Sequence, residues 1–224
     1  MRILLTNDDG YFSAGINLIY DLLSKEHEVI IIAPSEVMSA KSVSIILGKP
    51  VAVKQINDHT FMMDGTPADC VAFGLSSLNK KFDLVVSGCN HGFNISYDTM
   101  YSGTIGAALQ ALTYEVPAIA VSAENNFDIV KENFLELFAY IINENLLSKA
   151  YLLNINFPLG EVALGKKFTH IYYRKETTYY LSTPKGYFAT RNLNDDQCID
   201  KDSDVYCVHH GYISITKLKK TLDM

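Results

Sequence analysis

The sequence predicts an α/β fold in which a mostly parallel sheet is flanked by helices and followed by an appended C-terminal β region. Three observations support this prediction. Short apolar runs rich in β-branched residues alternate with helix-like stretches over residues 1–149, the helical pattern stops after about Lys149, and 224 residues are long for one domain and short for two. Strands joined by crossover helices form a parallel sheet buried on both faces, so the expected architecture is Rossmann-like.

Four short apolar runs are the expected strands of this sheet, at Arg2 to Leu5, Glu28 to Ala33, Phe82 to Ser87 and Pro117 to Ser122. Four amphipathic segments are each long enough for a crossover helix, at Gly15 to Ser24, Pro67 to Leu78, Ser102 to Leu112 and Asp128 to Asn143. The start of the second helix is marked most clearly. Thr66 can cap it, Pro67 suits its first position, and Asp69 favours the positive end of the helix dipole.

The last third of the chain is predicted to be β structure without a helix. Its strand-like segments are Tyr151 to Phe157, Thr169 to Arg174 and Asp204 to Thr216. Residues 177–203 contain turn residues and a polar cluster, which make a poor core and fit a loop or a hairpin arm. We therefore expect a Rossmann-like core over residues 1–149. Residues 150–224 complete the fold and carry an arm, at about 177–203, that is ordered against a partner subunit.

Composition and charge exclude several classes of protein. Hydrophobic residues make up 48% of the chain and charged residues 20%, unlike disordered or membrane proteins. The formal net charge is −6 without a long run of like charges, so neither a nucleic-acid polymer nor a membrane is expected as a partner. The N-terminal apolar run is too short for a signal peptide, which predicts a cytoplasmic protein with four reduced cysteines.

The first candidate site follows the first expected strand, at Asn7-Asp8-Asp9-Gly10. Gly10 permits a sharp turn at the edge of the sheet where open α/β folds bind ligands. Adjacent carboxylates repel each other, and a divalent cation between Asp8 and Asp9 would relieve that repulsion. Oxygen ligands of this kind suit Mg²⁺, Mn²⁺ or Ca²⁺. The alternative is an ordinary turn with two solvated aspartates.

The second candidate site follows the third expected strand. It begins with Ser87 to Asn94 and continues into Tyr101-Ser102-Gly103-Thr104 at the start of a small-residue helix. Free N–H groups and the positive dipole end of a helix meet at such a start, which makes it a ready phosphate site. The alternative is a loop with ordinary Asn and Gly turn chemistry.

A third, weaker segment follows the second expected strand and contains Ser39, Lys41 and further hydroxyls. Ser39 could complete a metal shell, although a Ser-rich loop is usually only a loop. Because all three segments follow parallel strands, we expect the fold to collect them at one edge of the sheet. His91 is a candidate neighbour of this site, and His209 and His210 are left unassigned.

At these motifs the sequence resembles the SurE family of phosphatases, and the match runs in order along nearly the whole chain. The matching segments are Ile3 to Gly10, Asp64 to Val71, Ser87 to Asn94, Tyr101 to Ala108 and Gly211 to Thr216. The resemblance implies hydrolysis of nucleoside 5′-monophosphates, sometimes 3′, and a C-terminal arm exchanged between the subunits of a homodimer or homotetramer.

The resemblance also implies roles for individual residues. Asp8, Asp9, Ser39 and Asn90 occupy the metal-ligand positions, for one divalent cation per subunit. Asn94 and the step Ser102-Gly103-Thr104 occupy the phosphate-handling positions. The chain departs from the family pattern at four positions. The family usually has Pro in place of Ala14, Gly in place of Ala40, Asn or His in place of Val43, and Pro in place of Lys217.

The resulting hypothesis is a metal-dependent phosphomonoesterase in which a metal-activated water attacks phosphorus and Asp8 or Asp9 takes its proton. The helix start at Ser102 would stabilise the phosphate charge. One alternative is a phosphatase with an aspartyl-phosphate intermediate, which the adjacent rather than alternate acids disfavour. Another is a non-catalytic nucleotide sensor, which would gain nothing from two carboxylates beside its ligand.

Overall fold

The computed structural model describes residues 1–124, 127–175, 177–192 and 198–220. Among these residues, one mixed sheet is built from strands β1 (Arg2–Thr6), β2 (Glu28–Pro34), β3 (Val53–Asn57), β4 (Thr60–Met63), β5 (Leu84–His91), β6 (Ala118–Ala123), β7 (Tyr151–Phe157), β8 (Gly165–Thr169) and β11 (Tyr212–Lys219). Its order is β3-β4-β2-β1-β5-β6-β7-β11-β8. The pairs from β4 to β7 are parallel, whereas β3 with β4 and β11 with β7 are antiparallel. The expected mostly parallel sheet is confirmed.

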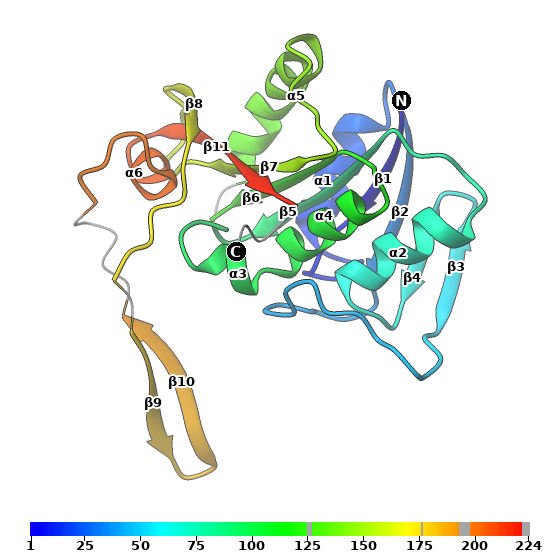
Figure 1. Cartoon of the computed structure of the whole chain (residues 1–224), viewed down its shortest axis with the longest axis horizontal. Helices are drawn as coiled ribbons and strands as arrows, with labels where there is room; N and C mark the ends of the chain where they lie inside the picture. Colours follow the sequence, from blue (N-terminus) through cyan, green and yellow to red (C-terminus); the bar gives the residue numbers. More distant parts are fainter. Residues whose placement is uncertain (125–126, 176, 193–197, 221–224) are drawn as a thin grey trace.

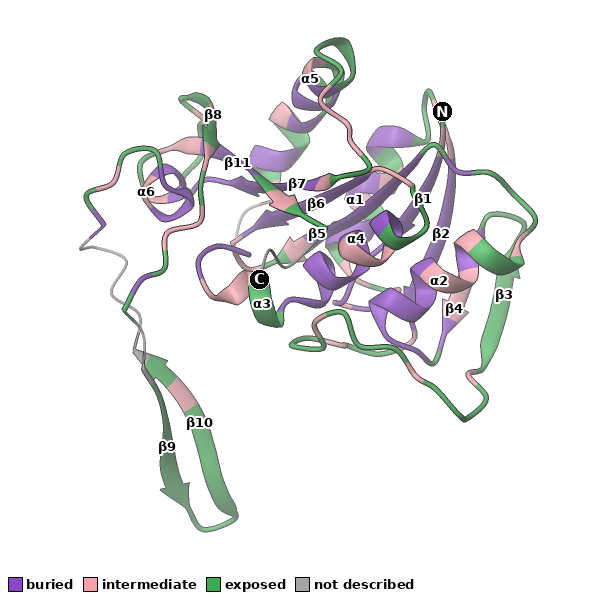
Figure 2. Cartoon of the chain, viewed as in Figure 1, coloured by how far each residue is buried: buried purple, intermediate pink, exposed green. Residues whose placement is uncertain are grey.

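Helices cover both faces of the sheet (Figure 1). The helices among the described residues are α1 (Ala14–Leu23), α2 (Pro67–Ser77), α3 (Asp98–Tyr101), α4 (Gly103–Thr113), α5 (Asp128–Asn143) and α6 (Asp204–His209). One core lies between the sheet and the pair α1 and α5, and a second core lies between the sheet and the pair α2 and α4. The central strands are therefore buried on both sides, as Figure 2 shows.

The start of α2 has the predicted capping. The Asp69 backbone N–H donates to the Thr66 hydroxyl at 3.1 Å, and the Thr66 backbone N–H donates to the Asp69 carboxylate at 2.9 Å. Pro67 occupies the first turn, where its missing N–H is not needed. These reciprocal bonds satisfy two donors that the helix itself leaves unpaired.

Two predictions for the C-terminal part are wrong. The segment Thr169 to Arg174 is not a strand, because only Thr169 belongs to β8 and His170 makes an isolated bridge. The segment Asp204 to Thr216 begins with helix α6 and only then becomes β11. Ser203 caps α6 by accepting a hydrogen bond from the Tyr206 N–H at 3.1 Å. Val205 and Val208 are three residues apart and reach the same apolar cluster, which is helical spacing.

The expected arm is a hairpin of strands β9 (Thr177–Thr183) and β10 (Gly186–Asn192), paired antiparallel. It projects away from the sheet and its helices (Figure 1). Its exposed large side chains include Tyr180, Leu181, Tyr187 and Phe188. Part of the predicted arm, residues 193–197, lies outside the described residues.

Two further observations bear on the sequence predictions. All four cysteines are buried free thiols. None of the described helices is long and apolar enough to cross a membrane.

Candidate active site

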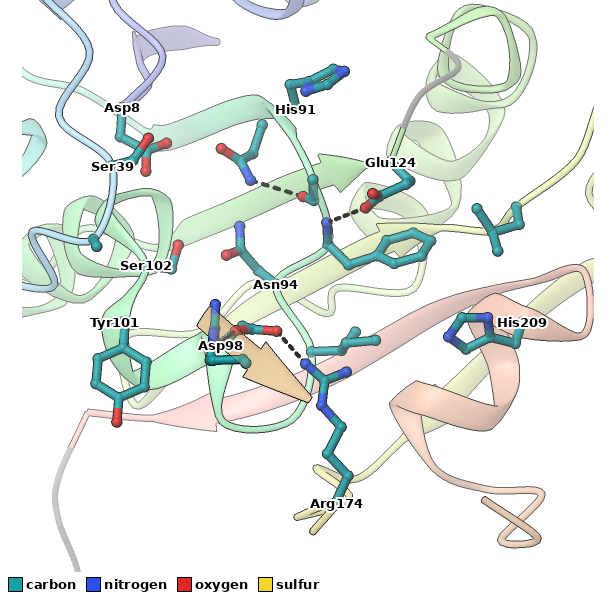
Figure 3. Close-up of a pocket in the computed structure, with 17 residues that line it drawn as sticks. Asp8, Ser39, His91, Asn94, Asp98, Tyr101, Ser102, Glu124, Arg174 and His209 are labelled. Atoms are coloured by element: carbon teal, nitrogen blue, oxygen red, sulfur yellow. Dashed lines mark hydrogen bonds and ion pairs between the residues drawn. The ribbon is translucent and has the colours of Figure 1, made fainter. Parts of the chain in front are cut away.

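The segments after β1, β2 and β5 meet at the carboxyl edge of the sheet, because β1 lies between β2 and β5. A pocket of about 610 Å³ opens there (Figure 3). Five of the predicted site residues line it: Asp8, Ser39, Asn90, Asn94 and Ser102. The remaining three lie next to them: Thr104 donates to Asp8, Gly103 packs against Asp8, and Asp9 accepts from the His91 backbone.

Asp8 is the most perturbed acid of the site. Its side chain is only 4% exposed, and Thr104 donates a hydrogen bond from its hydroxyl to the Asp8 Oδ1 at 2.5 Å. Burial raises the pKa of Asp8 to about 6 and the neighbouring Asp9 adds to the rise, while the Thr104 hydrogen bond opposes it. Asp8 is thus a buried acid held in place without a positive partner among the contacts described.

Asp9 is half-buried and points to the neighbouring strand. Its Oδ2 accepts a hydrogen bond from the His91 backbone N–H at 2.9 Å. Burial raises the pKa of Asp9, and the His91 N–H and imidazole oppose that rise. The His91 side chain itself is exposed, so its backbone is what connects it to the acidic pair.

The start of α4 lies directly against Asp8. The Ser102 hydroxyl caps the helix by accepting from the Ile105 N–H at 3.1 Å. A Cβ on Gly103 would come within 2.8 Å of the Asp8 Cβ, so only glycine allows this approach. Gly106, one turn later, would place a Cβ 1.9 Å from the Ser42 carbonyl oxygen. Small residues therefore let the start of α4 approach Asp8 and the loop after β2 closely.

Asn90 and Asn94 contribute amide groups along and beyond β5. The Asn90 Nδ2 donates to the Gly92 carbonyl at 2.8 Å, which leaves its Oδ1 available to a ligand. Asn94 is buried, and its Nδ2 donates to the Ser122 hydroxyl at 2.8 Å. Its backbone carbonyl accepts from Asn154 and Asn156, which lie on β7. Asn154 and Asn156 were not predicted as site residues, although they are two residues apart in an otherwise apolar strand and so lie on one face of it.

The pocket also contains residues that the sequence analysis did not select. Phe93, Asp98, Glu124, Leu159, Arg174, Arg191 and His209 line it. Arg174 is 2% exposed and its Nη2 lies 2.6 Å from the Asp98 carboxylate. Arg191, on the hairpin, pairs with the same carboxylate. Arg174 was expected to end a strand, and only the fold brings it beside Asp98, which begins α3.

The donor set fits a hard divalent cation. Within the described residues, no group of three or more His, Cys, Asp and Glu side chains is placed to hold a metal. A cation here would therefore be held by two carboxylates together with neutral oxygens, and oxygen donors suit Mg²⁺, Mn²⁺ or Ca²⁺. A positive charge would also remove the repulsion that helps to raise the pKa of Asp8. Val43, where the family pattern has a polar residue, does not line the pocket.

The loop after β2 has an unusual backbone at the pocket. Ala40 and Ser42 adopt positive φ angles of 57° and 51°. Residues with a Cβ are disfavoured in this left-handed region. The glycine that the family pattern has at position 40 fits this conformation without strain.

Comparison with known proteins gives a consistent result. The family model described as "Survival protein SurE" matches residues 3–178. A protein of Clostridium tetani named 5′-nucleotidase SurE is 40% identical, covering 97% of this chain and 93% of its own length. One of Clostridium botulinum (strain Alaska E43 / Type E3) with the same name is 35% identical, with the same coverage. The crystal structure of the SurE protein from Aquifex aeolicus superimposes with a TM-score of 0.85 at 32% identity, covering 99% of this chain and 94% of that one. This chain belongs to the SurE family.

Proposed function

We propose that this protein is a metal-dependent phosphomonoesterase that hydrolyses nucleoside 5′-monophosphates, and also 3′-monophosphates, to nucleoside and phosphate. The observation that carries the proposal is the meeting of two opposite features in one pocket. The acids Asp8 and Asp9 attract a cation, and the helix start at Ser102 attracts an anion. A cation and a phosphate can therefore bind side by side, which is the arrangement that phosphoryl transfer needs.

The relatives support the choice of substrate. Proteins that are 34–40% identical over nearly the full chain carry the name 5′-nucleotidase. The pocket also extends well beyond the space that a phosphate needs, since residues from α6 and from the segment after β7 line its far end. A substrate with a larger organic part than phosphate fits this size.

Asp8, Asp9, Ser39 and Asn90 would hold one divalent cation, with Mg²⁺ or Mn²⁺ as the working ions. When bound, the cation supplies Lewis-acid polarisation of the phosphate and a lower pKa for a bound water. The chain's own residues do the rest. The N–H groups of Gly103 and Thr104 stabilise the negative charge of the phosphate oxygens.

Other residues of the site position groups and move a proton. Asn94 orients the phosphate, because Ser122 fixes its side-chain amide and the β7 asparagines fix its backbone carbonyl. Asp8 or Asp9 takes the proton of the attacking water.

The two alternatives make different demands on these residues. An aspartyl-phosphate mechanism favours acids that alternate in the sequence, whereas Asp8 and Asp9 are adjacent. A non-catalytic sensor has no use for two acids beside its phosphate, since like charges disfavour binding. Hydrolysis assisted by a cation is the function that uses both features.

The hairpin arm supports a homodimer or homotetramer. Its aromatic side chains project into solvent in the single chain, including Tyr180, Tyr187 and Phe188. An exposed apolar surface of this kind marks a protein interface. Light scattering at micromolar concentration should give an oligomer mass, and a hairpin variant with Tyr187→Ser and Phe188→Ser should shift it to the monomer.

The proposed activity is tested by phosphate release from a panel of nucleoside monophosphates with Mg²⁺, with Mn²⁺ and after EDTA treatment. The expected result is turnover that depends on added metal and is lost in Asp8→Asn. Asp21→Asn, which changes an exposed acid on α1, is the matched control and should keep wild-type turnover. Full turnover after exhaustive metal removal, or wild-type turnover in Asp8→Asn, would overturn the proposal.

A further inference from the structure

The pocket has a second end, away from the acidic pair. Figure 3 shows Asp8, Ser39 and Ser102 on one side of the pocket and His209 on the other, with Glu124 between them. Phe93, Leu159 and His209 line this second end, and none of them is a candidate for metal or phosphate binding. The first end therefore presents carboxylate and hydroxyl oxygens, whereas the second presents an aromatic ring, an aliphatic side chain and an imidazole, with Glu124 between them.

We propose that this second end selects ribonucleotides, with Phe93 stacking on the base and Glu124 accepting hydrogen bonds from the sugar hydroxyls. The inference rests on the proposed function, since it assigns the organic part of the same substrate. It assigns roles to Phe93 and Glu124, for which the sequence patterns predicted none.

Phe93 is held as a rigid platform. It packs against the cluster formed by Ile95, Val205 and Val208, and yet it stays partly exposed and lines the pocket. Its ring meets the His209 imidazole edge to face, with centroids 6.1 Å apart and planes at 76°. An aromatic ring fixed from behind and open to a pocket is suited to stack with a nucleobase, and every base has a face for it.

Glu124 is suited to a neutral hydroxyl-bearing group rather than to phosphate. Its Oε2 accepts a hydrogen bond from the Phe93 backbone N–H at 3.1 Å, which fixes the carboxylate beside the aromatic platform. A carboxylate only accepts hydrogen bonds and repels an anion. Sugar hydroxyls are donors without charge, and an acidic side chain on ribose hydroxyls is the arrangement that dinucleotide-binding sheets use.

The spacing of the two ends matches the connectivity of a nucleotide. Phe93 is the neighbour of Asn94 in the chain, so the base platform adjoins the residue proposed to orient the phosphate. Glu124 bonds to the backbone of Phe93 and thus lies at the junction. Phosphate, sugar and base would meet Asn94, Glu124 and Phe93 in that order.

Three substrates that lack different parts of the nucleotide distinguish the base contact of Phe93 from the sugar contact of Glu124. The substrates are adenosine 5′-monophosphate, its 2′,3′-dideoxy form and ribose 5-phosphate, assayed with Mn²⁺. Phe93→Leu keeps an apolar side chain for the cluster, and Glu124→Gln keeps an acceptor for the Phe93 N–H. The controls are Phe168→Leu on β8 and Glu132→Gln on α5, which change exposed residues outside this pocket.

Phe93→Leu should lower kcat/KM for adenosine 5′-monophosphate about tenfold and leave ribose 5-phosphate within about twofold of wild type. Glu124→Gln should lower kcat/KM about fivefold for the two ribose substrates and leave the dideoxy nucleotide unchanged. Equal losses on all three substrates, or no loss on any, would overturn the inference. Both controls should match wild type.

A binding measurement keeps the inference separate from the proposed activity. Calorimetry with Mn²⁺ compares a non-hydrolysable phosphonate analogue of adenosine monophosphate with inorganic phosphate. Phe93→Leu should weaken binding of the analogue about tenfold and leave phosphate binding unchanged. If wild-type protein releases no phosphate, the proposed function fails, and this binding ratio still decides the inference. Equally weakened binding of both ligands would refute the proposed stacking of Phe93 on the base.

Discussion

Replacing Asp8 by Asn should stabilise the metal-free protein while removing its activity. The pKa of Asp8 in the folded chain is about 6 instead of 3.8. The unfolded chain releases the proton near pH 3.8, whereas the folded chain keeps it up to about pH 6. The metal-free fold therefore loses stability as the pH rises through this window, and the whole loss is present at pH 7.

The size of this effect follows from the same pKa. A difference of roughly two pKa units corresponds to about 3 kcal/mol in the free energy of unfolding. Asn keeps an oxygen that can accept the Thr104 hydrogen bond and carries no charge. At pH 7 in EDTA, the variant should therefore gain about 1 to 3 kcal/mol and melt several degrees higher than wild type. At pH 4 the gain should be small, because wild-type Asp8 is then protonated.

With bound metal, the wild-type protein should become more stable than Asp8→Asn. A cation that binds the folded state stabilises it by mass action, and the loss of one anionic ligand weakens that binding. Thermal melts with and without Mn²⁺ at pH 4 and pH 7, together with phosphate release, measure both effects. Asp21→Asn should behave as wild type throughout. A melting temperature of Asp8→Asn in EDTA at or below wild type, together with an unchanged Mn²⁺ shift, would refute the reasoning.

Three further substitutions test the surroundings of the site by chemical denaturation. Ala40→Gly should stabilise the fold by about 1 kcal/mol, because the backbone φ of Ala40 is 57°. The control Ala139→Gly, in the middle of α5, should cost about 1 kcal/mol. If both substitutions lowered the free energy of unfolding, Ala40 would not be strained. Gly106→Ala should destabilise by about 2 kcal/mol or more, since the clash with the Ser42 carbonyl outweighs the better helix propensity of Ala; a gain would show that the loop moves freely. Arg174→Met should cost about 2 kcal/mol, because it breaks the ion pair between the buried Arg174 and the partly buried Asp98. An unchanged denaturation midpoint would contradict this.

The sequence predicts the central strands well because their pattern has one physical cause. β1, β2 and β6 are buried on both faces, and such strands need continuous apolar runs. The hairpin of β3 and β4 has no such run, since β3 is exposed at every position. An edge strand of this kind depends on pairing with its neighbour, which the sequence does not display.

Some residues of the candidate site were likewise predictable from the sequence, and others were not. Asp8, Asp9 and the step at Ser102 follow local rules for strand ends and helix starts, so the sequence reveals them. Glu124 and Arg174 reach the pocket only because β6 lies beside β5 and the chain after β8 returns beneath α3. Their roles depend on tertiary contacts, which no local pattern encodes.

The ion pairs at Asp98 connect the hairpin to the proposed phosphate site. Asp98 opens α3, α3 leads into Ser102, and Arg191 on β10 holds the same carboxylate as Arg174. A movement of the hairpin that separated Arg191 from Asp98 would change the charge beside the start of α4. If hairpin binding to a neighbouring subunit changed the affinity for phosphate, phosphate binding would change the affinity between the subunits by the same factor. Oligomerisation and substrate binding would then be thermodynamically coupled, and the affinity for substrate would depend on the protein concentration.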